Sequence, residues 1–185
     1  MAQARDLPEA PPPGPAGRII HRACATMAVL AVLLFCIEAA MTVASIVGRT
    51  LFRMPVPGDF ELVQMLSAMG IAMCLPYCQW RGGHVFVDFF TLWAPNRLKR
   101  VLDMIAALLL AGSAFLLSWR IWNGLLDMYE YGETSMVIAL PVWWGYVPVV
   151  PAFALLGCTA LYTFYRELHG YRQPAYRDQT GEIAE

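Results

Sequence analysis

Residues 81–90 read RGGHVFVDFF, a charged turn with two glycines that runs directly into an apolar, amphipathic segment. Long hydrophobic stretches lie on both sides, so we interpret it as a short hydrophilic turn at a membrane face. Just beyond the turn, Val85, Phe89 and Trp93 recur at helical spacing, whereas Asp88 lies off their face. This pattern predicts a short helix in the membrane interface, with an irregular loop dipping into the headgroups as the alternative.

The composition is that of a membrane protein. Of the 185 residues, 58% are hydrophobic and only 15% are charged, whereas about a quarter of a globular chain is usually charged. The charges are confined to short segments between apolar stretches, which leaves no polar region for a separate catalytic domain. The net charge of −1 provides no basic footprint for nucleic acid. The lipid bilayer is therefore the expected environment.

Four apolar stretches each approach the ~20 residues needed to cross the hydrocarbon core. They cover roughly residues 23–47, 60–80, 98–122 (with helix continuing towards 131) and 142–165. The fold class predicted is an all-α membrane protein with four transmembrane helices and a short interfacial helix between the second and third. Asp59 is the expected N-cap of the second helix, and Pro76 is expected to kink it.

Three segments follow from this division. Residues 1–17 are rich in Pro, Ala and Gly and are expected to be a disordered tail. Residues 18–170 form the transmembrane domain, and residues 171–185 a polar C-terminal tail. The basic start of the first span could belong to a signal peptide. Its apolar run is longer than the 7–15 residues of a signal h-region, so an uncleaved helix is favoured.

Basic residues are distributed unevenly between the segments that connect the spans. The second connecting segment has four of them, whereas the third has none and carries three acidic residues. Because an excess of Lys and Arg marks cytoplasmic loops, both termini and the second segment are predicted to be cytoplasmic. Arg49 and Arg53 in the first connecting segment run against this assignment. The residues counted in the second and third segments are Arg81, Arg97, Lys99, Arg100, Asp127, Glu130 and Glu133.

No enzyme active site can be assembled from the sequence. It has no glycine-rich phosphate loop, no nucleophile elbow and no metal-ligand spacing, so no cofactor or metal is expected. The histidines fall in loops or at membrane edges, which argues against a haem anchor. The five cysteines lie inside apolar stretches and are interpreted as small packing residues. Cys74 and Cys78 share a helical face, so a thiol pair or a metal site is the alternative.

Glu38 is the one acidic residue well inside a span. An ionisable group at this depth costs at least ~2.5–3.5 kcal/mol on insertion scales, so it must be paired, protonated or functional. One interpretation is a proton or cation carrier in a self-sufficient small exporter. The other is an acid that is protonated, or hydrogen-bonded to a neighbouring helix or a partner subunit.

Two further pairs of polar residues lie at the membrane edges. Arg49 and Glu61 flank the first outer hairpin and could form an ion pair across it, which would be worth little if exposed. His84 and Asp88 are four residues apart and would share one face of a helix. They are either solvated residues of a turn or a contact with another subunit.

The ordered set of motifs resembles the small membrane subunit of the tripartite ATP-independent periplasmic (TRAP) transporters. The resemblance covers about residues 49–146 and includes Arg49, the helix start at Glu61 and the Arg81…His84…Asp88 loop. It also takes in the stretches ETS at 133–135 and IALP at 138–141. In the family an Arg follows the first helix and a Glu opens the second, and Arg49 and Glu61 match these places. The pair Gly82-Gly83 before the His departs from the family pattern.

The resemblance implies one part of a three-part importer in the bacterial inner membrane. A periplasmic solute-binding protein captures an organic acid, and a large TRAP membrane subunit carries it inward by a sodium-driven elevator motion. The small subunit packs against the scaffold of the large one and has no substrate site of its own. The candidate subunit-interface residues are then Glu38, Arg49, Glu61, Arg81, His84 and Asp88. The alternatives are the exporter that uses Glu38 and a membrane anchor of a redox complex.

Overall fold

The computed structural model describes residues 15–53, 58–81 and 96–168, which are almost entirely helical. Helix α1 is followed directly by a short π-helical turn, η1, and the fourth long helix is divided into two parts. The elements are α1 (Pro15–Val47), η1 (Gly48–Phe52), α2 (Asp59–Trp80), α4 (Asn96–Tyr131), α5 (Trp143–Tyr146) and α6 (Val149–Leu168). The expected interfacial helix with His84 and Asp88, and most of both tails, lie outside the described residues.

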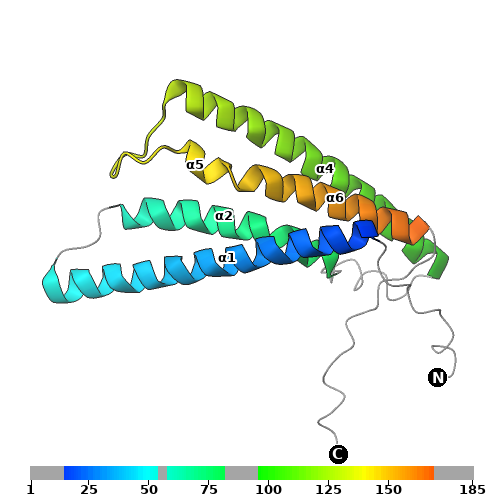
Figure 1. The fold of residues 1–185 in the computed structure, drawn as a ribbon, viewed down its shortest axis with the longest axis horizontal. Coiled ribbons are helices and arrows are strands. Elements are labelled where there is room, and N and C mark those ends of the chain that lie inside the picture. Colours follow the sequence, from blue (N-terminus) through cyan, green and yellow to red (C-terminus); the bar gives the residue numbers. More distant parts are fainter. Residues whose placement is uncertain (1–14, 54–57, 82–95, 169–185) are drawn as a thin grey trace, which may run out of the picture.

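The long helices lie side by side in the order α1, α2, α6, α4 (Figure 1). Helices α1 and α2 form one hairpin, and α4 with α5–α6 forms the other; α2 packs on α6 and joins the two. The start of α1 and the end of α6 lie at the same end of the array (Figure 1). We call this the terminal end, and the opposite one, where α1 turns into α2 and α4 into α5, the loop end.

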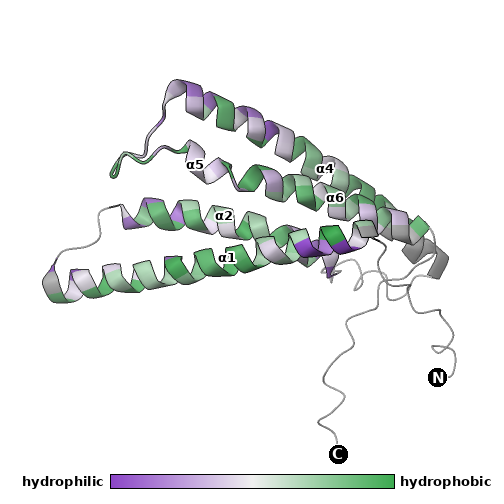
Figure 2. Ribbon diagram, in the orientation of Figure 1, coloured by the Kyte–Doolittle hydropathy of each residue, from purple (hydrophilic) through white to green (hydrophobic). Residues whose placement is uncertain are grey.

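In the described part of the chain, four helices are long and apolar enough to cross a membrane, which confirms the predicted fold class. The spans are Ala16–Leu51, Asp59–Trp80, Met104–Tyr131 and Trp143–Tyr165. Apolar residues dominate the middle of the helices, whereas hydrophilic residues gather at the start of α1 and at the loop end of α4 (Figure 2). At 36 residues, α4 is ~54 Å long, so it is longer than the ~30 Å hydrocarbon core is thick.

The helix boundaries depart from the sequence expectations at three places. Helix α1 begins at Pro15, so the last residues of the expected tail are helical. The residue that precedes α2 is Gly58, with a left-handed φ of 74° and no side-chain cap, so the prediction of Asp59 as N-cap is wrong. The fourth span is interrupted at residues 147–148, because Pro148 has no N–H to donate and separates α5 from α6.

Small residues allow the helices to approach closely. The core is built around Ala31, Ala72, Met73 and Ala152, from α1, α2 and α6. In each hairpin a phenylalanine ring also lies against a glycine: Phe35 against Gly70 in α1–α2, and Phe115 against Gly157 in α4–α6. Without a hydrophobic difference between lipid and side chains, such close packing is the main source of helix association in a membrane.

The outward faces of α1 and α4 are apolar. Large exposed side chains on these helices include Val29, Leu33, Leu109, Leu116 and Trp119. A soluble protein of this size would bury such residues, so this surface is built to face lipid or another membrane protein.

Candidate functional site

The most elaborate polar structure in the described part of the chain is the loop between α4 and α5. Helix α4 ends at Tyr131. The next residue, Gly132, has a φ of 63°, which lets Glu133 N–H bond back to the carbonyl of Met128 at 3.3 Å. This is a Schellman C-cap. The chain then folds back on itself, with Thr134 bridged to Pro141 and Ser135 N–H bonded to the carbonyl of Leu140 at 2.8 Å.

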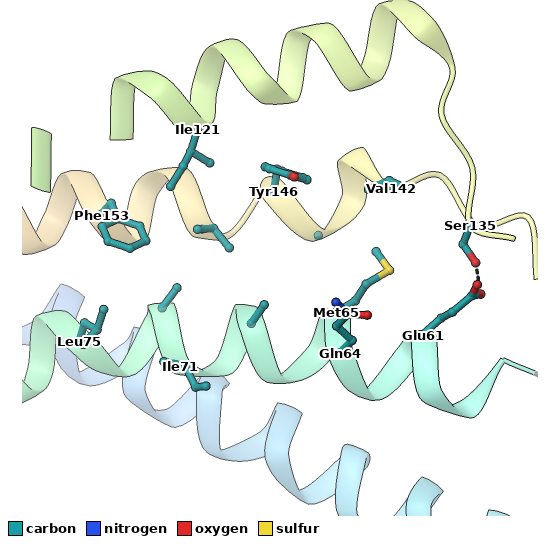
Figure 3. Close-up of a pocket in the computed structure, with 14 residues that line it drawn as sticks. Glu61, Gln64, Met65, Ile71, Leu75, Ile121, Ser135, Val142, Tyr146 and Phe153 are labelled. Carbon is teal, nitrogen blue, oxygen red and sulfur yellow. Dashed lines mark hydrogen bonds between the residues drawn. The ribbon is translucent and has the colours of Figure 1, made fainter. Parts of the chain in front are cut away.

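The carboxylate of Glu61, in the first turn of α2, holds the tip of this loop. Its Oε1 accepts the backbone N–H of Met136 at 3.0 Å and that of Val137 at 3.2 Å. The hydroxyl of Ser135 donates to Oε2 (Figure 3). Successive backbone N–H groups that converge on one point form an anion-binding nest. Here the anion belongs to the chain itself, so Glu61 ties the second helical hairpin to the first.

A second contact joins the same two parts of the chain. A Cβ added at Gly58 would lie 2.6 Å from Cγ2 of Ile138, so the loop rests directly on the residue before α2. Met136, at the loop's tip, is 99% exposed. The loop is thus held against the start of α2 by Glu61 and Gly58. Its apolar tip, Met136, is exposed.

Arg49 lies in η1 with an exposed side chain, and it does not form the ion pair with Glu61 that the sequence suggested. Both oxygens of Glu61 are occupied by the α4–α5 loop instead. Asp59, at the start of α2, accepts the hydroxyl of Ser45 on its Oδ2 at 2.5 Å. The expected ion pair is absent because Glu61 bonds instead to residues more than seventy positions away in the sequence.

Glu38 links α1 to α2. The hydroxyl of Ser67 donates to its Oε1 at 2.6 Å, and Oε2 is buried without a partner among the described residues. The hydrogen bond to a neighbouring helix, which was one of the expectations for Glu38, is therefore present.

A groove of about 570 Å³ runs between α2 and α5–α6, with α4 contributing to its wall (Figure 3). Its polar members, Glu61, Gln64 and Ser135, lie towards the loop end. Deeper in the bundle its walls are apolar, with Ile71, Leu75 and Phe153. None of the described residues that line it is basic, so this lining offers an organic anion no countercharge and suits hydrophobic groups instead.

At the terminal end, Arg81 follows the last residue of α2 and lies against Tyr77. Its Nε and Nη2 donate to the phenol oxygen at 3.1 and 2.9 Å. Next to it, Trp80 contacts the ring of His21 in α1 and stacks on Tyr162 in α6, with centroids 5.6 and 5.3 Å apart. Three helices therefore meet at this end through aromatic rings.

Sequence reasoning missed the serines that bind these carboxylates. Ser45, Ser67 and Ser135 each donate to one acidic side chain of another element. Ser45 and Ser67 are hydroxyls inside apolar spans, where such groups often bond between helices, so their presence was a usable signal. Which carboxylate each would meet depends on the packing.

Comparison with known proteins gives a family match. The family model described as "Tripartite ATP-independent periplasmic transporters, DctQ component" matches residues 38–170. This range begins at Glu38 in α1, contains all of α2, α4, α5 and α6, and makes up well over half of the chain. Neither a curated protein nor a solved structure matches the chain.

Proposed function

The chain belongs to the DctQ component family of the TRAP transporters, and from this premise we propose that it serves a sodium-driven importer of organic acids. The match confirms the resemblance seen in the sequence. It makes the chain a multi-pass membrane protein and the small permease subunit of a transporter, not an enzyme. The sodium coupling, the class of substrate and the particular partners are the proposal.

We expect the partners to be a large TRAP membrane subunit and a periplasmic solute-binding protein, in a bacterial inner membrane with both termini cytoplasmic. The family match carries this proposal. The groove beside α2 and the apolar outer faces of α1 and α4 support it, because they suit packing against the helices of a larger membrane protein. Glu38 fits an accessory role because its carboxyl group is bound to Ser67 within the chain.

The decisive experiment is reconstitution into proteoliposomes with an inward sodium gradient. The vesicles compared contain both membrane subunits, this chain alone, the large subunit alone, or neither. The binding protein, loaded with radiolabelled organic acid, is added outside the vesicles. Uptake is expected only with both membrane subunits, and it should stop when the gradient is dissipated.

Co-purification provides an independent check, since a tag on this chain should recover the large subunit from detergent extracts. Solute flux from vesicles that contain this chain alone would overturn the accessory role. Full uptake by the large subunit alone would show that the chain is dispensable.

A further inference from the structure

A second groove lies on the opposite hairpin, between α1 and the end of α2. Its volume is about 340 Å³, and Tyr77 of α2 forms one wall. The other described lining residues are small or aliphatic and come from α1: Ala25, Ala28, Val29, Val32 and Leu33. The groove therefore follows α1 within the span Ala16–Leu51 and begins about three turns after the start of α1.

Two arginines continue the same face of α1 towards the terminal end. Arg18, Arg22, Ala25 and Val29 follow one another at intervals of four, three and four residues, which places them on one side of a helix. Both arginine side chains are exposed. The apolar groove thus ends in two cationic groups at the depth where a helix leaves the hydrocarbon.

A third guanidinium belongs to the same end of the groove. The ring contact between His21 and Trp80 sets the end of α2 level with the second turn of α1. Arg81 follows Trp80, and its side chain is held on the hydroxyl of Tyr77. Because the Tyr77 ring lines the groove, Arg81 lies at its mouth.

The electrostatics of this mouth favour an anion. The start of a helix carries a partial positive charge, which favours a nearby anion. The first turn of α1 has no acidic residue to supply that negative charge. Arginine binds phosphate through two parallel hydrogen bonds, which makes it well suited to a phospholipid headgroup. Basic sites beside transmembrane helices take up anionic lipids for this reason.

We propose that this groove and Arg18, Arg22 and Arg81 form a binding site for an anionic phospholipid from the leaflet at the terminal end. One acyl chain lies along Val29 and Leu33 against Tyr77, and the phosphate meets the guanidinium groups. The apolar length of the groove selects a lipid over a free phosphate, and the three charges select an anionic over a zwitterionic headgroup. The site is inferred without the family match, but Val29 and Leu33 also belong to the outer face of α1 that suits packing against the large subunit.

The test is native mass spectrometry of the full chain in delipidated detergent, titrated with phosphatidylglycerol or phosphatidylcholine of identical acyl chains. The chain should retain one phosphatidylglycerol with roughly tenfold or greater preference over phosphatidylcholine. The double variant R22Q/R81Q should lose most of that preference, since each basic residue near a headgroup contributes about a fivefold gain in binding. Equal binding of the two lipids would overturn the proposal.

Two variants separate the site from general charge and from the headgroup alone. Arg120→Gln removes an exposed arginine of α4 and should leave the preference unchanged; a loss equal to that of R22Q/R81Q would overturn the site. Val29→Trp fills the groove at a 61% exposed position without altering charge, and it should reduce phosphatidylglycerol retention while the helical circular dichroism stays the same. Unchanged retention would exclude the groove as the acyl-chain site.

Two further measurements decide between possible occupants. Glycerol 3-phosphate, which has no acyl chains, should not compete with the lipid; effective competition would mean a phosphate site without the groove. The titration is then repeated on the chain bound to its large subunit. Loss of phosphatidylglycerol binding in that complex would assign the groove to a partner helix instead.

Discussion

At the scale of single residues, Glu61 is the most connected polar group in the described chain. One side chain in the first turn of α2 accepts bonds from three consecutive residues of the α4–α5 loop. A charged acceptor shared by several donors makes shorter and stronger bonds than neutral pairs do. We therefore expect the loop's order, more than the stability of the bundle, to depend on Glu61.

Replacing Glu61 by alanine should release the tip of the loop. Amide hydrogen exchange at Met136 and Val137 should become roughly tenfold faster, because both N–H groups lose their acceptor. Glu61→Gln should give an intermediate rate, since the amide oxygen can still accept a bond. Glu130→Ala, at an exposed acidic position near the end of α4, is the matched control. Unchanged exchange in Glu61→Ala would mean that the loop holds its shape without the carboxylate.

Gly58 can be tested against Gly132, because both have positive φ but only one is crowded. An alanine in this region is strained by about 1–2 kcal/mol. At Gly58 the new Cβ would also meet Ile138, whereas nothing lies within 4 Å of the one at Gly132. Gly58→Ala should therefore lower the detergent melting temperature more than Gly132→Ala does. Adding Ile138→Ala should remove the difference, and equal effects of the two glycine variants would contradict the contact.

The helices form two hairpins that share one packing device. In α1–α2, a Cβ at Gly70 would lie 2.7 Å from the ring of Phe35, and in α4–α6 one at Gly157 would lie 2.9 Å from the ring of Phe115. Each ring occupies the space that a side chain would need. Each hairpin thus has its own fixed point of closest approach.

Gly157→Val should loosen the second hairpin. The larger side chain must displace the Phe115 ring, and overpacking of this kind typically costs about 1–3 kcal/mol. The melting temperature of the chain in detergent measures the loss. Gly112→Val, on the same hairpin but with nothing within 4 Å, should leave it nearly unchanged. Phe115→Ala added to Gly157→Val should restore part of the stability; no restoration would show that the ring is not the obstacle.

The long helices could be predicted because each is a continuous apolar run of membrane-spanning length. The positions at which a helix is interrupted could be predicted less accurately. Pro76 lies in the interior of α2, and the helix continues through it, whereas Pro148 separates α5 from α6. Both residues lack an N–H, so the sequence alone gives the same local signal. The tertiary setting separates them, since Pro76 is fully buried and Pro148 follows a single helical turn.

Two acidic residues of the candidate site stood out in the sequence, but their hydrogen-bond partners did not. Glu38 stood out because an acidic group is costly inside a bilayer, and Glu61 because it opens the second helix where the family has a Glu. The partner of Glu61 was assigned to Arg49, its neighbour across the hairpin, and the structure gives it to the distant residues 135–137. Charge patterns identify groups that need partners, whereas the choice of partner follows from how α2 and the α4–α5 loop are brought together.

At the scale of the whole molecule, the orientation of any one helix across the membrane determines on which side of the membrane each connecting segment lies. The start of α1 and the end of α6 share one end of the array (Figure 1), and four helices can each cross the membrane. The loop held by Glu61 is then on the side of the membrane opposite the start of α1 and the end of α6. Placed outside, it would face the compartment of the proposed solute-binding protein.

The orientation prediction is that the terminal end is cytoplasmic and the α4–α5 loop periplasmic. The physical reason is that Lys and Arg are retained on the cytoplasmic side, and residues 81–100 contain four of them, whereas residues 123–142 contain none. Fusions of alkaline phosphatase, which is active only outside, and of green fluorescent protein, which fluoresces only inside, are made after Gly132 and after Arg172. Phosphatase activity is expected only at Gly132, and fluorescence only at Arg172.

Since Arg49 and Arg53 oppose this arrangement, R49Q/R53Q should leave both signals unchanged or stronger. Reporters in one compartment would mean that the fourth span does not cross the bilayer, and exchanged signals would mean that the basic residues do not set the orientation.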